Sequence, residues 1–267
     1  MIRVLRQNDI KMLIELFKIS GRVNKEEVKN IYYNMNTTKV VVGNIVDDRI
    51  TSLLIANLIN NEYYLEDIIF INNDINEIKE VLKYMIEVLR TDERGLSIIY
   101  DNIPYSEVMN SIMLDCNFKC DYINFISEHT DRVELIRNRV LINDINDEVN
   151  NYMMDSYDKE YSLIKEYLGE VNNYNTDIDI SKTNIVVAKD TSDSVIGLLR
   201  FGLITDSIYI SNIYGDNDEV ILDLINVVRN LTNRNIEIGI YPVRNDLINL
   251  LLQNGFNKAH ADYKYKF

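Results

Sequence analysis

The 267-residue chain contains no tryptophan, two prolines, two cysteines and two histidines. The cysteines, Cys116 and Cys120, have no histidine cluster near them, so the sequence predicts two buried, reduced thiols and no zinc site. The histidines, His129 and His260, stand without a neighbouring serine or cysteine, which argues against a catalytic triad. The chain also lacks a phosphate-binding glycine loop, a dinucleotide fingerprint and the zinc motif HExxH. We therefore expect no metal cofactor.

Long hydrophobic runs are missing as well. No apolar stretch approaches the roughly 20 residues that cross a membrane, and Leu53–Ile59 has only the length of a strand. Met1–Ser20 lacks the basic and then apolar order of a secretion signal and is typical of a strand followed by a helix. We expect a cytoplasmic protein without a membrane partner.

Positive charge is scarce relative to negative charge. With 28 lysines and arginines against 42 aspartates and glutamates, the formal charge is −14. Such a chain repels nucleic acid and anionic lipid. The acidity has two interpretations: it keeps the protein soluble, or it attracts a small cationic molecule. The hydrophobic fraction of 46% is ordinary for a globular protein, and the length suits one large or two mid-sized domains.

One order of predicted elements occurs twice along the chain. In the second copy, a strand-rich stretch is followed by an acidic helix (Asp218–Leu231), a strand (Ile236–Tyr241), a short helix, the turn Gly255-Phe256 and a closing strand. The first copy runs from 38 to 126 and has Asn117-Phe118 at the corresponding turn. A repeat this long indicates two similar domains, because each copy is large enough to bury its own core.

A strand and two helices are predicted before each of these sets. In the first copy they are Ile2–Leu5, a helix with Asp9 at its N-cap, and Glu26–Tyr33. In the second copy the two helices are Ile145–Tyr157 and Lys159–Val171. The polar stretch between the copies is typical of a linker, so we expect domains at 1–131 and 132–267.

This order of elements resembles that of the GCN5-related N-acetyltransferases. The segment Ile236–Phe267 carries the most telling part, with a strand, Asn245, a helix and then Gly255-Phe256. The N-terminal Ile2-Arg3 and Asp9-Ile10 are similar to the opening strand and helix of the family. The resemblance implies an α/β (α+β) fold of two tandem acyltransferase-like domains, each with a mixed, mostly antiparallel sheet flanked by helices.

The resemblance also implies an activity: transfer of an acetyl or other acyl group from acetyl-coenzyme A to an amine of a small molecule or peptide. In the family, the pantetheine arm of the cofactor binds backbone groups where the fourth and fifth strands part. That implies cofactor contacts at Asn245 and at two sets of strand residues. The sets are Ile69, Phe70 and Ile71 in the first copy, and Ser211, Asn212 and Ile213 in the second.

Two carboxylates of the first copy are candidates for the general base. Glu66 or Asp67 would take the proton of the amine, while a backbone amide near Ile71 would polarise the thioester carbonyl. The other interpretation makes Glu66 a solvated residue on an alternating strand. The same strand of the second copy carries Tyr209 and Ser211 in place of a carboxylate, which favours the first copy as the catalytic one.

The chain departs from the family at the start of each central helix. Family members place glycines there, so that the cofactor pyrophosphate approaches backbone N–H groups at the positive helix end. Here Asp74 and Glu77 occupy the first copy, and Asp216, Asp218 and Glu219 the second. These acids either cap their own helices or oppose the phosphate. In the first copy, Asn76, Lys79 and Lys83 could still meet the cofactor.

A second departure concerns the tyrosine that protonates the leaving thiolate in many members. Met113 and Leu251 stand at its expected positions, and neither can donate a proton. Elsewhere, the predicted helices of the second copy combine tyrosines with acids that would suit a cationic amine, or that form a core edge and a solvated face. These residues are Tyr152, Tyr157, Tyr161, Tyr167, Asp155, Asp158 and Glu160.

Two functions therefore remain open on the sequence. The chain is an acyl-coenzyme A-dependent N-acyltransferase, or it is a ligand-binding or protein-interaction module that has lost cofactor binding. The missing glycine loops and the missing tyrosines favour the module. The order of elements favours the enzyme.

Overall fold

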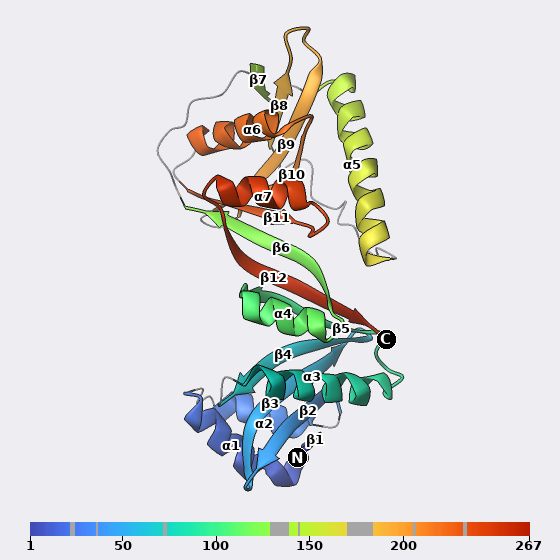
Figure 1. Ribbon diagram of the computed structural model, residues 1–267, viewed down its shortest axis with the longest axis vertical. Helices are drawn as coiled ribbons and strands as arrows, with labels where there is room; N and C mark the ends of the chain where they lie inside the picture. Colours follow the sequence, from blue (N-terminus) through green and yellow to red (C-terminus); the bar gives the residue numbers. More distant parts are fainter. Residues whose placement is uncertain are drawn as a thin grey trace. The chain divides into compact units, whose positions relative to one another are not determined.

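The computed structural model describes residues 1–21, 25–35, 37–71, 74–128, 139–143, 145–169, 184–204, 207–231 and 234–267 (Figure 1). His129 and the predicted domain boundary at residue 131 lie outside them. The chain divides into two compact units. The first unit contains Met1–Asp121 and Ala261–Phe267, and the second contains Tyr122–His260.

The first unit has the predicted order of elements. They are β1 (Ile2–Val4), a short 3-10 turn (Gln7–Asp9), α1 (Ile10–Ile19), α2 (Lys25–Asn34), β2 (Lys39–Val46), β3 (Arg49–Ile59), β4 (Glu62–Phe70), α3 (Ile75–Arg90), β5 (Ser97–Pro104), α4 (Glu107–Asp115) and the start of β6 (Lys119–Ser127). Strands β1 to β4 are antiparallel neighbours, and β4 pairs with β5 in parallel.

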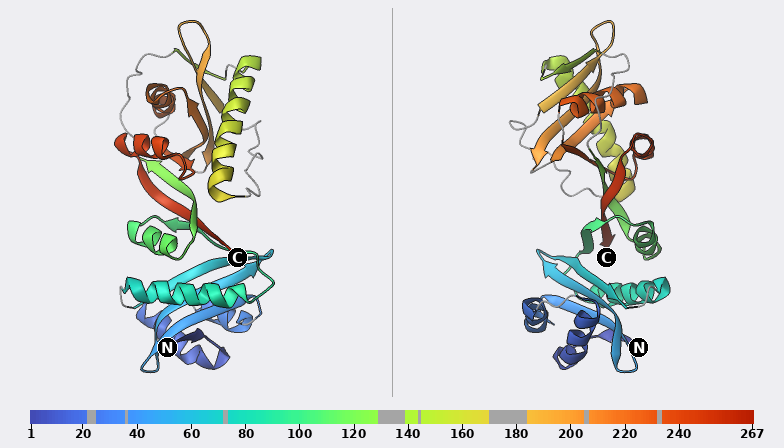
Figure 2. Two further views of the ribbon diagram at one scale, coloured as in Figure 1. Left: turned by 45° about the vertical axis from the view of Figure 1, so that its right-hand side comes forward. Right: turned by 90° about the vertical axis from the view of Figure 1, so that its left-hand side faces the viewer.

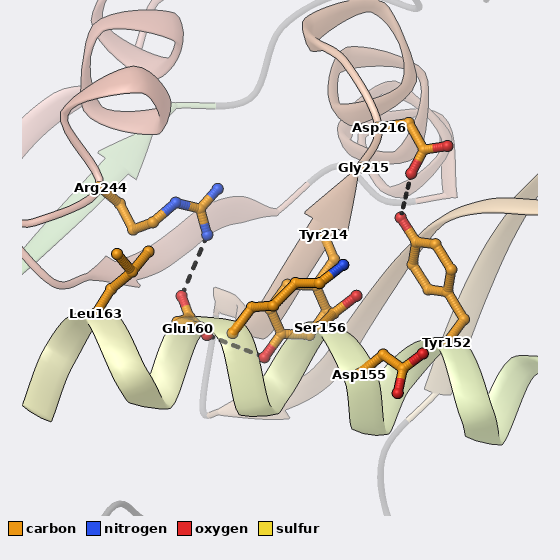
Figure 3. A pocket seen from close by; sticks show the side chains of 10 residues that line it. Tyr152, Asp155, Ser156, Glu160, Leu163, Tyr214, Gly215, Asp216 and Arg244 are labelled. Atoms are coloured by element: carbon orange, nitrogen blue, oxygen red, sulfur yellow. Dashed lines mark hydrogen bonds and ion pairs between the residues drawn. The ribbon is translucent and has the colours of Figure 1, made fainter.

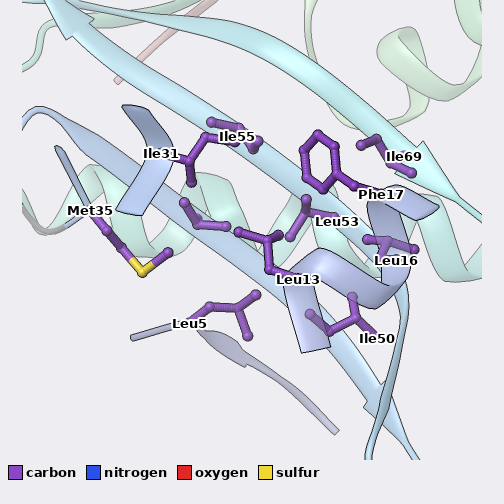
Figure 4. Packing of buried hydrophobic residues seen from close by; sticks show 11 residues of the cluster. Leu5, Leu13, Leu16, Phe17, Ile31, Met35, Ile50, Leu53, Ile55 and Ile69 are labelled. Atoms are coloured by element: carbon purple, nitrogen blue, oxygen red, sulfur yellow. The ribbon is translucent and has the colours of Figure 1, made fainter. Parts of the chain in front are cut away.

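Helices cover both faces of the sheet in the first unit (Figure 2, right). On one face, Leu13 and Phe17 of α1 and Ile31 of α2 pack against Leu53 and Ile55 of β3 (Figure 4). Successive strand residues point to opposite faces, so the intervening residues of β3 face α3. The apolar side of α3 follows the helical spacing read from the sequence and is buried at Ile78, Val81, Leu82, Met85, Ile86 and Leu89.

The start of α1 differs from the sequence prediction. Asp9 precedes α1, but its side chain makes no capping bond to that helix. Its carboxylate accepts two hydrogen bonds from the Arg3 guanidinium, both 2.7 Å long, and one from the Arg6 backbone N–H at 2.8 Å. Asp9 therefore ties the 3-10 turn back to β1.

The second unit repeats this order. Its elements are the end of β6, β7 (Arg139–Ile142), α5 (Asp147–Leu168), β8 (Asn184–Lys189), β9 (Val195–Ile204), β10 (Ser207–Gly215), α6 (Asp218–Leu231), β11 (Asn235–Ile240), α7 (Asn245–Gln253) and the start of β12 (Asn257–Lys266). Strands β7 to β10 are antiparallel neighbours and β10 pairs with β11 in parallel. The predicted fold class, tandem α/β units with mixed and mostly antiparallel strands, is confirmed.

One helix, α5, replaces the two that the sequence predicts between 145 and 171. It runs unbroken through Tyr157 and Lys159, because no glycine or proline interrupts its 22 residues. Figure 2 (left) shows α5 on one side of the strands, with α6 and α7 on the other. Val149 of α5 packs on Leu198 and Tyr214 of the sheet. Among the described helices, none is long and apolar enough to cross a membrane.

Each unit also contains a strand segment from the other half of the sequence. In the first unit, the Phe267 N–H bonds to the Leu96 carbonyl, and the Asn102 N–H bonds to the Asp262 side chain, so the end of β12 lies antiparallel to β5. In the second unit, the end of β6 pairs antiparallel with β11, and Ile123 lies opposite Ile240.

Candidate functional site

In both units, the fourth and fifth strands part early. In the first unit, β4 pairs with β5 only at Tyr63 and Tyr64. In the second, β10 pairs with β11 from Ser207 to Ile210. One extra residue then interrupts each antiparallel ladder to the third strand, Glu66 in β4 and Ser211 in β10. These bulges and the parallel pairs give a residue-by-residue correspondence between the two units.

This correspondence shows that the two predicted sets of cofactor contacts do not occupy matching positions. Ser211 corresponds to Glu66 and Asn212 to Asp67, while Ile69, Phe70 and Ile71 correspond to Tyr214, Gly215 and Asp216. The predicted set Ser211–Ile213 therefore lies three residues too early to match Ile69–Ile71. A bulge leaves no mark in residue type, so the sequence could not supply this register.

The two predicted bases lie at the bulge of β4. The Glu66 carboxylate is bound by the Lys39 ammonium and by Asn57 Nδ2 at 2.9 Å. Lys39 is buried, so the Glu66 carboxylate is the counter-charge of an enclosed ammonium. Asp67 is half-buried beside it.

In the first unit, the residues expected to contact the pantetheine arm lie at or just after the end of β4. Ile69 belongs to the apolar cluster under α1 and α2, Phe70 is half-buried and Ile71 is exposed. The Ile71 backbone N–H, proposed to polarise a carbonyl, donates to the Thr51 carbonyl at 2.8 Å. The corresponding N–H of Asp216 donates to the Ile196 carbonyl at 3.0 Å.

The start of α3 is capped by its own acids. Asp74 Oδ1 accepts from the Asn76 N–H at 2.9 Å and from the Glu77 N–H at 3.4 Å. The Glu77 carboxylate in turn accepts hydrogen bonds from three side chains, namely Asn44, Thr51 and Ser52. Burial acts to raise the pKa of Glu77, but these hydrogen bonds hold it below its usual range.

The predicted lysines of α3 lie away from this helix start. Lys79 forms an ion pair with Asp115 at the end of α4, and Lys83 is exposed. At the start of α6, Asn217 Oδ1 accepts from the Val220 N–H at 3.1 Å, and Asp218 and Glu219 are exposed in the first turn. With carboxylates at both helix starts, a pyrophosphate bound there would meet like charge.

The second unit contains a cavity of about 270 Å³ between α5, the end of β10 and the start of α6 (Figure 3). Most of its lining is polar or charged. The lining residues are Tyr152, Asp155, Ser156, Lys159, Glu160, Leu163, Tyr214, Gly215, Asp216 and Arg244. The α5 residues among them recur at helical spacing, and they include three of the seven residues that the sequence indicated, namely Tyr152, Asp155 and Glu160. Four others of that set do not line the cavity: Tyr157, Asp158, Tyr161 and Tyr167.

Glu160 and Arg244 form one end of the cavity (Figure 3). Arg244 Nη1 donates to Glu160 Oε1 at 3.2 Å, and the Tyr214 hydroxyl donates to Glu160 Oε2 at 2.9 Å. Asn212 Nδ2 donates to the Tyr214 hydroxyl at 3.2 Å. Burial, and then the Glu160 charge, raise the pKa of Tyr214 far above its usual range, so this hydroxyl stays protonated.

Tyr152 and Asp216 form the other end. The Tyr152 hydroxyl lies 3.0 Å from Asp216 Oδ1 and 3.0 Å from the Ile196 carbonyl oxygen. Burial, and then the negative charge of Asp216, raise the pKa of Tyr152. Gly215 lets α6 approach the end of β10, because a Cβ at this position would lie 2.8 Å from Ile221 Cγ1. Asp155 lies beside these residues on α5 (Figure 3).

The matching place in the first unit is filled with apolar side chains. Tyr214 corresponds to Ile69, and Arg200, which is buried on β9, corresponds to Ile55. Ile55 and Ile69 pack with Phe17 in the apolar cluster (Figure 4). The same strand positions are thus polar in the second unit and apolar in the first. This contrast makes the cavity of the second unit the candidate ligand site.

Two of the residues that define this site were not predicted for it. Tyr214 and Arg244 carry no motif, and only the fold brings them to α5. The predicted Asn245 is the exposed first residue of α7, next to Arg244. Met113 and Leu251, at the expected tyrosine positions, are fully buried. Within the described residues, no group of histidine, cysteine, aspartate or glutamate side chains could hold a metal ion.

Comparison with known proteins finds similarity at the level of structure. No protein-family model and no curated protein matches the chain. A tandem GNAT protein from the clavulanic acid biosynthesis pathway has a TM-score of 0.39 and 10% identity, over 100% of this chain and 98% of that one. A GCN5-related N-acetyltransferase from Sphaerobacter thermophilus has a TM-score of 0.45 and 9% identity, over 100% and 95%. A GNAT-family acetyltransferase from Colwellia psychrerythraea has 0.45 and 11%, over 100% and 99%. Identities this low say nothing of substrate or reaction.

Proposed function

We propose that the chain is an N-acyltransferase that transfers an acetyl or other acyl group from acetyl-coenzyme A to a small amine, with the second unit as the catalytic half. The observation that carries the proposal is the acidic cavity of that unit. Asp155, Glu160 and Asp216 supply carboxylates there, and Glu160 is held in place by Tyr214 and Arg244.

The cavity residues suit an ammonium ligand. A carboxylate attracts a cation and can take the proton that an ammonium must lose before its nitrogen attacks a carbonyl carbon. Asp155 and Asp216 are both exposed to the cavity mouth, whereas the two oxygens of Glu160 are already engaged. We therefore assign amine binding and proton acceptance to Asp155 and Asp216, and a positioning role to Glu160.

A second candidate function is binding of an amine without transfer. The specific observation in its favour is the acid at both helix starts, where the coenzyme pyrophosphate would bind. The Asp74 side chain accepts hydrogen bonds from two N–H groups of α3, and three acids flank the start of α6. These carboxylates would repel the phosphates of the coenzyme, whereas binding of an amine alone requires no phosphate site.

Titration calorimetry with acetyl-coenzyme A at low and moderate salt, followed by mass spectrometry of a panel of amines, tests the proposal. Micromolar cofactor binding and acetylation of an amine, slowed by Asp216→Asn and unchanged in the exposed-turn control Asp47→Asn, would support it. Amine binding without cofactor binding up to millimolar concentration would establish the second candidate. Absence of amine binding would overturn both.

A further inference from the structure

The cavity of the second unit contains charges of both signs, and the Arg244–Glu160 ion pair forms one end of it. Arg244 and Glu160 stand at one end, and Asp155 and Asp216 at the other (Figure 3). We propose that the ligand is a small zwitterion of the amino-acid class, which carries a carboxylate as well as the amine. This inference rests on the proposed function and adds the second recognised group.

Arg244 has bonding capacity left for an anion. Its guanidinium makes one hydrogen bond to Glu160 at 3.2 Å and two to Asp246 at 3.4 Å. Charge-assisted bonds of this kind are usually about 2.7–2.9 Å long. Two of its five N–H groups take no part in these bonds, and its side chain is 14% exposed at the cavity wall. The N–H groups that remain can donate to a carboxylate.

Lys159 and Asp155 bring opposite charges to the same lining. They lie four residues apart on α5, and both belong to the cavity, so they share one face of the helix. In the part of the chain that the structure describes, neither one forms an ion pair or a hydrogen bond through its side chain. An ammonium beside Asp155 and Asp216, with a carboxylate beside Lys159 and Arg244, would pair all four charges.

The size of the cavity and its mixed charge exclude other ligands. Pockets for drug-sized molecules enclose roughly 300–1,000 Å³, so about 270 Å³ suits a smaller ligand. A simple amine would pair with Asp155 and Asp216, but it would bring a second cation next to Lys159, whose ammonium forms no ion pair within the described residues. A simple carboxylate would face Asp155 and Asp216. Each mismatch brings like charges together.

The test compares matched ligands by titration calorimetry on the full chain. The zwitterions are glycine, β-alanine, 4-aminobutyrate and 6-aminohexanoate. In this series the distance between the ammonium and the carboxylate ranges from shorter to longer than the rise of one helical turn. The single-charge controls are the amines and the carboxylates of equal carbon number. We expect the best zwitterion to bind about tenfold more tightly than either of its single-charge controls.

Variants on α5 identify which end binds which group. Lys159→Met should weaken binding of the zwitterion about fivefold and leave the matched amine unchanged. Asp155→Asn should weaken both. Lys165→Met and Glu166→Gln, on exposed positions of the same helix outside the cavity, should change neither.

The outcomes separate this inference from the proposed function. If the amine binds as tightly as its zwitterion, or if Lys159→Met leaves the zwitterion unchanged, the zwitterion inference is wrong and the amine site stands. If amines and zwitterions alike fail to bind, the proposed function is wrong as well.

Discussion

Arg244 and Glu160 hold each other at the cavity wall, with 14% of each side chain exposed and 3.2 Å between Nη1 and Oε1. One partner comes from the residue before α7 and the other from the middle of α5. The pair therefore joins two elements that are distant in the sequence. The Glu160 carboxylate also accepts a hydrogen bond from the Tyr214 hydroxyl. Glu160 therefore fixes the shape of the cavity more than it serves as a free base.

The substitution Glu160→Gln should destabilise the protein by about 1–2 kcal/mol, because the largely buried Arg244 loses its closest counter-charge and keeps only its longer contact with Asp246. The amide keeps the size of the side chain and can still accept from Tyr214. Urea unfolding measures the loss. The control Glu166→Gln, exposed on the same helix, should stay within about 0.5 kcal/mol of wild type. Equal stability of the two variants would contradict the structural role given to the pair.

Gly239 on β11 lies directly under Tyr122 of β6. A Cβ at Gly239 would fall 1.5 Å from the Tyr122 hydroxyl oxygen, so Gly239→Ala should cost about 2–3 kcal/mol by displacing the ring. In the double variant with Tyr122→Ala the clash disappears. We expect the double variant to lose less stability than the sum of the single changes in chemical denaturation. Additive losses would show that the ring does not occupy this place.

Strands β6 and β12 each contribute residues to both units. This arrangement predicts reciprocal effects of mutations in the two strands. Tyr263 of β12 is buried in the first unit, where its hydroxyl bonds to Asn110 of α4 at 3.0 Å, and Phe125 of β6 is buried in the second. Tyr263→Ala should reduce hydrogen-exchange protection mainly in α3 and α4, and Phe125→Ala mainly in α6 and β11. Loss of protection confined to the opposite unit in either variant would contradict this arrangement.

The Arg3–Asp9 pair predicts a pH dependence. The hydrogen bonds from Arg3, opposed by burial, hold the pKa of Asp9 below its usual range. A carboxylate with a lowered folded pKa stabilises the fold above its unfolded pKa, about 3.9, and this contribution is lost as the pH falls through the folded value. Asp9→Asn should therefore be less stable than wild type at pH 6. The difference should shrink below about pH 4 in urea titrations at each pH. A constant difference from pH 6 to pH 2 would contradict it.

Much of the fold could be predicted because local signals agree with it. The apolar spacing of α3 predicts its buried side. The acids Asp74 and Glu77 bind groups of the protein itself, as one of the two interpretations of the sequence had it. In α5, however, no glycine or proline ends the helix at Tyr157, so the prediction of two helices there was wrong.

The site was less predictable, because its register and its partners are set by tertiary structure. Ser211 looks like any strand residue, yet its bulge shifts every later residue of β10 and places Tyr214 rather than Ile213 opposite α5. The Arg244–Glu160 contact joins residues 84 positions apart. The acidic and tyrosine-rich face of α5 was visible in the sequence. Its partners were not.

The placement of β12 has a consequence for synthesis. Asn102 and its partner Asp262 are 160 positions apart, so β5 leaves the ribosome long before the strand that covers its edge. An uncovered edge strand is a template for pairing with other chains. The edge of β5 therefore stays uncovered until the second half of the chain has been translated. A nascent chain that stalls between the two halves exposes this edge to other chains.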